Sequence, residues 1–168
     1  MIDIKDVKDN ISVLLKHYRS TQDIIEPFLF SKTALLELCG WIELAIDDIF
    51  GRYAKKYLDV DECKKCLDAI DNIHAFSYEY HLKKIGIQLV GRIGFAELES
   101  CLGEQTTQQL RNLLNSIYSQ RIENAHAYID IRQMDRLKKI NAPDMTLKQL
   151  DEIYELFKNF EEQLESIY

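Results

Sequence analysis

Apolar residues recur at helical spacing along most of the chain. From Ile4 to Tyr18 they fall every three or four positions, which is the pattern of one buried stripe on an amphipathic helix. Ser31 and Thr146 have the side chains that cap helix N-termini. The pattern predicts about five helices, over 4–18, over 31–53, from Asp59 or Asp61 to 75, from Thr106 or Thr107 to 129, and over 146–167.

Prolines and glycines predict where the helices are interrupted. Pro27 with the apolar run after it, and the segment 141–144 around Pro143, are expected to be turns. Four of the six glycines lie between 80 and 103, so this stretch is expected to be a loop with one short helix near 95–101. No segment alternates with a period of two. We therefore expect an all-α helical bundle that forms a single domain over residues 1–168.

Composition and charge narrow the range of functions. The 168 residues are 46% hydrophobic and 29% charged, as in folded globular proteins. The net charge of −7 argues against a general nucleic-acid or membrane coat, although residues 105–140 hold six basic and only three acidic side chains. No apolar run approaches the ~20 residues that span a bilayer, and the first residues do not resemble a signal peptide. We expect a cytoplasmic protein with no membrane partner, whose four cysteines stay thiols.

Polar residues continue the apolar stripe of the helix predicted to end at 129. With Leu110 as the origin, Arg121 falls at about 20°, Asn124 at about 320° and Tyr128 at about 0°, while His126 lies at the edge, at about 160°. Two interpretations follow. Either the stripe ends near residue 120 and Arg121 reaches solvent, or these four side chains line a polar pocket. Such a pocket has the groups that phosphodiester cleavage requires, because histidine moves protons near neutral pH and arginine holds a phosphate.

The segment from Arg121 to Tyr128 has the form R-x4-H-x-Y, on the penultimate predicted helix of an all-α chain. It resembles the HEPN superfamily of small helical bundles, in which an arginine and a histidine at this spacing mark metal-independent RNases. A long helix with Leu38-Cys39-Gly40-Trp41-Ile42-Glu43 before the motif and an amphipathic closing helix after it are also similar. The resemblance implies an up-and-down helical core and a homodimer whose two motifs face one cleft.

The resemblance also implies roles for individual residues. Arg121 would bind the scissile phosphate, and His126 would assist the RNA 2′-hydroxyl or the leaving oxygen, giving 2′,3′-cyclic phosphate ends. Many members are toxins of toxin–antitoxin or anti-phage defence modules, and a nucleotidyltransferase antitoxin modifies the tyrosine that Tyr128 matches. Ile122 departs from the family, which usually has a polar residue there, and Asn124 is the candidate substitute.

Three further arginines, Arg92, Arg132 and Arg136, are candidate RNA contacts. No cofactor or metal is expected, since Cys63 and Cys66 lack the second ligand pair of a structural zinc site. Two alternatives stay open. Ile122 and the acidic net charge favour a catalytically silent HEPN-type module that binds nucleotide or protein, and the chain can also be an unrelated helical interaction protein.

Overall fold

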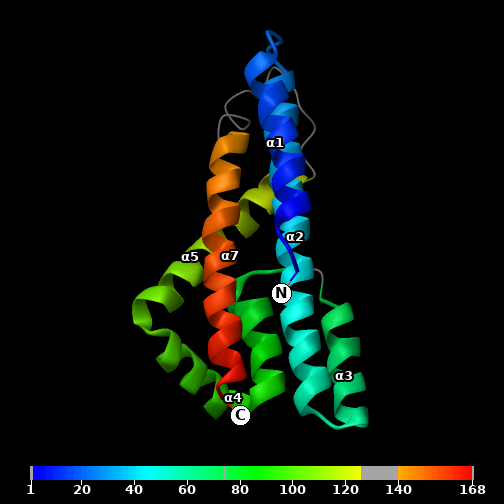
Figure 1. Cartoon of the computed structure of the whole chain (residues 1–168), viewed down its shortest axis with the longest axis vertical. Coiled ribbons are helices and arrows are strands. Elements are labelled where there is room, and N and C mark those ends of the chain that lie inside the picture. The colour runs from blue at the N-terminus through cyan, green and yellow to red at the C-terminus, as the bar shows by residue number, and fades with distance from the viewer. Residues whose placement is uncertain (1, 74, 126–139, 168) are drawn as a thin grey trace. The chain divides into compact units, whose positions relative to one another are not determined.

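The computed structural model describes residues 2–73, 75–125 and 140–167 (Figure 1). Within these ranges the chain forms α-helices and one short π-helix and no strand, so the predicted all-α class is confirmed. The helices are α1 (Lys5–Ser20), α2 (Glu26–Tyr57), α3 (Val60–Asp71), η1 (Tyr78–Leu82), α4 (Lys83–Leu102), α5 (Glu104–Ala125) and α7 (Pro143–Glu165).

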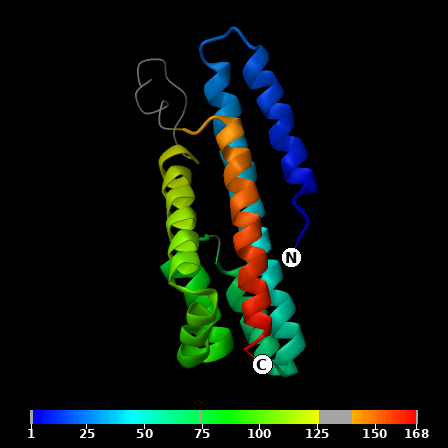
Figure 2. The same ribbon diagram turned by 60° about the vertical axis from the view of Figure 1, so that its left-hand side comes forward.

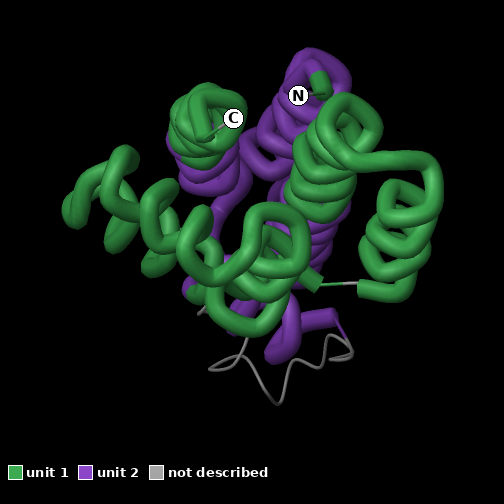
Figure 3. Tube along the Cα trace, turned by 90° about the horizontal axis from the view of Figure 1, so that it is seen from below, with its two compact units in different colours: residues 1–2, 42–115, 153–168 green, residues 3–41, 116–152 purple. Residues whose placement is uncertain are grey.

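The chain divides into two compact units (Figure 3). The boundaries between them fall inside α2, α5 and α7. Unit 1 consists of residues 1–2, 42–115 and 153–168, and unit 2 of residues 3–41 and 116–152. Each unit is therefore built from segments that are distant in the sequence. The single domain over 1–168 stays a prediction.

In unit 2, α1 lies beside the first half of α2 (Figure 2). The side-chain amide of Asn10 donates to Glu37 at 2.9 Å, and the ring centroids of His17 and Phe30 are 5.8 Å apart. Lys8 pairs with Asp151 of α7 at 2.7 Å. The apolar stripe predicted for the first helix supplies part of the core, because Ile11 is fully buried.

In unit 1, the second half of α2 packs against the end of α7. The rings of Phe50 and Phe160 meet edge to face at 5.9 Å, and both are buried. Arg52 bonds to Glu161 at the edge of this contact, and Lys56 bonds to Glu165. Asp59 caps α3 as predicted, since its carboxylate accepts the backbone N–H of Glu62 at 2.9 Å.

Three helices begin earlier than the sequence pattern predicted: α2, α7, and α5, which begins at Glu104 rather than at Thr106 or Thr107. Proline is the reason in α2 and α7. Pro27 and Pro143 lie in the first turns of α2 and α7, where a missing N–H costs nothing and the fixed φ suits a helix. Ser31 and Thr146 consequently lie buried inside α2 and α7 rather than at their N-termini. Asp23 caps the start of α2, because its carboxylate accepts the backbone N–H groups of Ile25 and Glu26.

The loop predicted over 80–103 is wrong: this stretch is helical, with a sharp reversal at Gly91. Gly91 has φ 74° and ψ 173°, a backbone conformation essentially confined to glycine. The helical segments before and after it lie side by side, since Lys83 bonds to Glu99 and a Cβ at Gly86 would lie only 2.3 Å from the Phe95 ring. Gly86 thus permits close packing, and Gly91 makes the turn.

The substitution Gly91→Ala is expected to destabilise the protein by ~1–3 kcal/mol, because an alanine there is strained whatever the surrounding space. Gly51→Ala is the matched control in a regular helix, where the new Cβ would meet Leu67 at an ordinary 3.6 Å. That variant should stay within about 1 kcal/mol of the parent. Urea unfolding followed by circular dichroism measures both, and equal stability of the two variants would contradict the assigned reversal.

Candidate functional site

The C-terminal part of α5 carries the residues singled out from the sequence. Leu110, Leu114 and Ile117 are fully buried along one side of the helix, and Asn124 continues this side with only 4% of its surface exposed. The amide nitrogen of Asn124 donates to the backbone carbonyl of Gln120 at 2.7 Å. A buried polar side chain therefore occupies a position where the pattern would otherwise place leucine.

Arg121 and Ile122 lie differently from one another. Arg121 is half-buried, so its side chain lies partly in solvent and partly against the protein. Ile122 is 57% exposed, about 100° further around the helix, and so does not belong to the side that carries Asn124. The apolar side chain at 122 consequently lies outside that polar side.

Gln120 adds a group that the sequence reasoning did not single out. Its side-chain oxygen is buried, and no donor among the described residues reaches it. An acceptor left in this way costs ~1–3 kcal/mol. Gln120 lies one turn before Asn124 on α5. The spacing of four residues in the sequence therefore indicates that the two side chains share one side of the helix.

The remaining candidates are placed only in part. Arg92 is exposed just after the reversal in α4 and belongs to unit 1, whereas Arg121 and Asn124 belong to unit 2. The other four, His126, Tyr128, Arg132 and Arg136, lie outside the described residues.

A second polar group, here called the Glu99 cluster, lies in unit 1 and consists of Tyr78, Lys83, Glu99 and Arg111. The Glu99 carboxylate accepts the Tyr78 hydroxyl at 2.9 Å and the Lys83 ammonium at 2.9 Å on both oxygens. The Arg111 guanidinium is 3.7 Å from Glu99 and 3.0 Å from Glu79, and it lies over the Tyr78 ring. The sequence did not predict this cluster, because a loop over 80–103 does not bring Glu99 to Lys83, whereas the reversal at Gly91 does.

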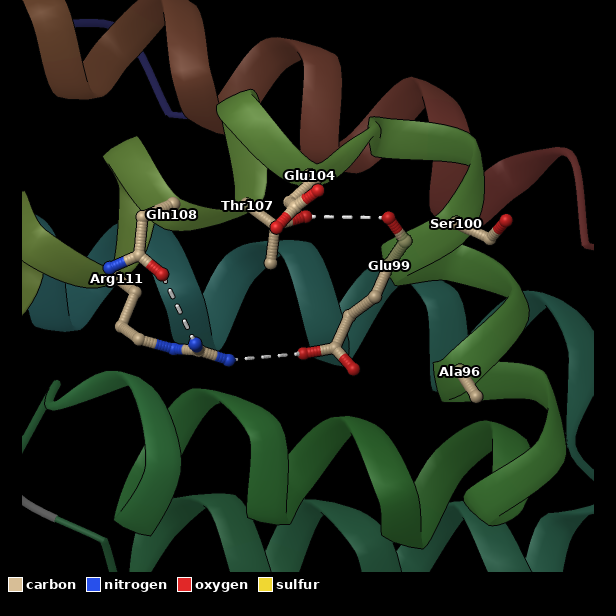
Figure 4. A pocket seen from close by; sticks show the side chains of 7 residues that line it. All are labelled: Ala96, Glu99, Ser100, Glu104, Thr107, Gln108 and Arg111. Carbon is tan, nitrogen blue, oxygen red and sulfur yellow. Dashed lines mark hydrogen bonds and ion pairs between the residues drawn. The ribbon is translucent and has the colours of Figure 1, made fainter.

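The Glu99 cluster borders a hollow of about 490 Å³ between α4 and α5 (Figure 4). Figure 4 shows Glu99 and Arg111 facing one another across it from the two helices. Burial, followed by the neighbouring Glu99 carboxylate, raises the pKa of Tyr78 well above its usual range. A phenol held neutral and donating to a carboxylate is a structural link, and the cluster fixes the two helices together.

His81 forms hydrogen bonds with Ser77, the residue that precedes η1. Its Nδ1 accepts the backbone N–H of Ser77 at 3.1 Å and lies 2.7 Å from the Ser77 hydroxyl oxygen. Burial, helped by the Lys84 charge, lowers the pKa of His81, and Glu43 acts in the opposite direction. Nδ1 can accept only while it carries no proton, so the contact selects the neutral ring.

The described residues can also be examined for the geometry of a metal site or a membrane span. Across the described residues, no three His, Cys, Asp or Glu side chains gather as a metal site would require, and Cys63 and Cys66 are half-buried on α3. In the same part of the chain, none of the helices combines the length and the hydrophobicity of a membrane span.

No model of a known protein family matches the chain, and neither the curated proteins nor the solved structures yield a match.

Glu99→Gln is expected to lower the free energy of unfolding by ~1–3 kcal/mol, because Lys83 and Arg111 lose their shared anion while the side chain keeps its shape. Glu155→Gln is the control, since the exposed pair of Glu155 and Lys158 contributes less than about 0.5 kcal/mol. Equal effects in urea unfolding would show that the Glu99 cluster does not hold α4 and α5.

His81 should make the fold sensitive to acid. Its pKa is lower in the folded chain than the ordinary 6.5, so the unfolded state binds the proton first and stability falls as the pH drops below about 6.5. His81→Asn keeps an acceptor for the Ser77 N–H but does not titrate in this window. The difference in urea midpoint between pH 7.5 and 5.5 should therefore be smaller in His81→Asn than in the parent. An undiminished difference in His81→Asn contradicts this assignment.

Proposed function

We propose that the chain is a metal-independent endoribonuclease of HEPN type that acts as a homodimer, and that it serves as the toxin of a prokaryotic toxin–antitoxin or anti-phage defence module. The observation that carries the proposal is the buried Asn124 on the side of α5 that Arg121 also borders. Asn124 is thus a polar residue on the buried side of α5, where packing alone favours an apolar one.

The proposed chemistry is the one that the resemblance of the R-x4-H-x-Y segment to the HEPN superfamily implies. The RNA 2′-oxygen attacks the adjacent phosphorus while the bond to the 5′-oxygen breaks, so the products are a 2′,3′-cyclic phosphate and a 5′-hydroxyl. His126 moves a proton at the 2′-hydroxyl or at the leaving oxygen, and Arg121 stabilises the charge that develops on the phosphate. Asn124 supplies a polar group beside Arg121. No step needs a metal or a cofactor.

Two structural facts support an active enzyme over the silent binding module. Ile122 is exposed and turned away from the side that bears Asn124, so its departure from the family pattern does not interrupt the polar face. Arg121 is half-buried, which leaves part of the side chain accessible to a phosphate. Arg92, Arg132 and Arg136 are proposed to contact the RNA backbone, where cationic side chains contribute affinity.

Purified protein should cleave labelled tRNA or mRNA in EDTA, and His126→Ala and Arg121→Ala should each lower the rate by at least ~10²-fold. His17→Ala and Arg19→Ala are matched controls, because both residues are exposed on α1. All variants are first shown to be folded by circular dichroism, and the intact mass establishes that Tyr128 carries no modification.

RNA left intact by the folded, unmodified parent would overturn the proposal and favour the binding module. The same holds if His126→Ala cleaves as fast as His17→Ala, since the activity would then reside elsewhere or in a contaminant.

A further inference from the structure

Two cysteines lie one helical turn apart on α3, within unit 1. Cys63 and Cys66 are both half-buried free thiols, whereas Cys39 is buried in the core and Cys101 is exposed on α4. A spacing of three residues in an α-helix places the two Cα atoms about 5 Å apart and both side chains on the same side of the helix. Disulfides join Cα atoms that are about 4.4–6.8 Å apart, so the backbone already holds this pair within range of a bond.

The Cβ atoms of the two cysteines must approach one another before that bond can form. Neighbours three residues apart on a helix have Cβ atoms about 5–6 Å apart, whereas a disulfide needs about 3.5–4.5 Å. A bridge between Cys63 and Cys66 therefore requires the start of α3 to depart from regular helix geometry. Such a bridge is strained, and strained disulfides are more easily reduced than relaxed ones.

The start of α3 has few contacts that would resist this distortion. The helix lies beside the second half of α2 (Figure 1), and Leu67 is the side chain that a Cβ at Gly51 would meet. Ile70 is the one buried residue of α3, all of which the structure describes, and like Leu67 it follows both cysteines. Val60, at the first position, is 86% exposed. Segments with few buried apolar contacts open locally at low free energy, so this end of the helix can adjust.

The environment of Cys66 suits the second of two exchange steps. Burial raises the pKa of the Cys66 thiol, and the charge of a Cys63 thiolate acts in the same direction. Because the thiolate is the attacking species, a raised pKa slows attack on a disulfide from solution. Attack on a disulfide already attached to the same helix is intramolecular, and the high local concentration compensates for the small thiolate fraction.

We propose that Cys63 and Cys66 form a reversible redox site, in which a low-molecular-weight disulfide such as oxidised glutathione converts the two thiols to an intrahelical disulfide and distorts the start of α3. The resting chain keeps both thiols. No residue of the R-x4-H-x-Y segment takes part, so the site goes beyond the proposed RNase activity and is tested without RNA.

The exchange proceeds in two steps. The Cys63 thiolate attacks one sulfur of oxidised glutathione, which forms a mixed disulfide and releases the first glutathione as a thiolate. Cys66 then loses its proton and attacks the Cys63 sulfur, so that the bond to the second glutathione breaks. The two cysteines lose two electrons and two protons, and both pairs end on the two glutathione thiols.

The experiment incubates the folded chain with oxidised glutathione, quenches it with acid, unfolds it and blocks the remaining thiols with N-ethylmaleimide. Lys64 and Lys65 separate the two cysteines, so trypsin places Cys63 and Cys66 on different peptides. In the parent these peptides should stay joined and carry no glutathione. Reduced glutathione should separate them again. Hydrogen exchange, measured by mass, should become faster in α3 after oxidation and stay unchanged in α1.

Three variants, each first shown to be folded by circular dichroism, separate the two steps. Cys66→Ser should stop at the first step, so that glutathione on Cys63 accumulates to at least about tenfold its level in the parent. Cys63→Ser should form no bridge. Cys101→Ser is the matched control, since it removes an exposed thiol outside α3, and it should form the bridge as fast as the parent.

The inference is overturned if the parent retains glutathione on Cys63 as Cys66→Ser does, or if neither cysteine reacts. It is also overturned if the bridge joins either cysteine to Cys101 or to a second chain. A bridge between Cys63 and Cys66 that leaves hydrogen exchange in α3 unchanged contradicts the distortion. Because none of these measurements involves RNA, failure of the proposed RNase leaves the redox site in place, and the reverse also holds.

Discussion

The positive φ at Gly91 is the constraint on which the organisation of unit 1 depends. It lets one helical stretch turn back on itself, so that Phe95 packs over Gly86 and Glu99 reaches Lys83. Glu99 in turn accepts the buried Tyr78 hydroxyl and approaches Arg111 of α5. A side chain at Gly91 would strain the turn that brings these groups together.

The α5 helix changes along its length from apolar packing to polar side chains on the same side. Its first half contributes leucines to the core and Arg111 to the Glu99 cluster. Its last turns keep the same buried side but place Asn124 there, with Arg121 at the border. A rigid helix positions such groups more accurately than a loop does, which is what the proposed phosphate site would need.

Periodicity predicted most of the fold, because α1, α3 and α5 carry regular apolar stripes with little to interrupt them. The prediction was wrong at prolines and glycines that are compatible with two local structures. Proline is found in turns and in the first turn of a helix, and glycine in loops and at close helix contacts. Pro27 and Pro143 begin helices rather than end them, and the glycines between 86 and 94 serve packing and a reversal rather than a loop. Tertiary contacts decide such cases, and a local pattern does not contain them.

The candidate site was predictable to the extent that it lies on one helix. The helical wheel placed Asn124 on the buried side of α5, whereas Glu99 and Lys83 could not be joined without the turn at Gly91. His126 and Tyr128 lie outside the described residues, so their roles come from the R-x4-H-x-Y pattern alone.

The proposed RNase cuts RNA by using the RNA's own 2′-hydroxyl. The most direct measurement is cleavage of an oligoribonucleotide in EDTA, compared with the same oligonucleotide carrying a single 2′-deoxy nucleotide at the mapped cleavage position, with product ends identified by mass. The account predicts a 2′,3′-cyclic phosphate from the ribonucleotide and no cut at the deoxy position. Cutting at the deoxy position, or a 3′-hydroxyl end, would contradict it.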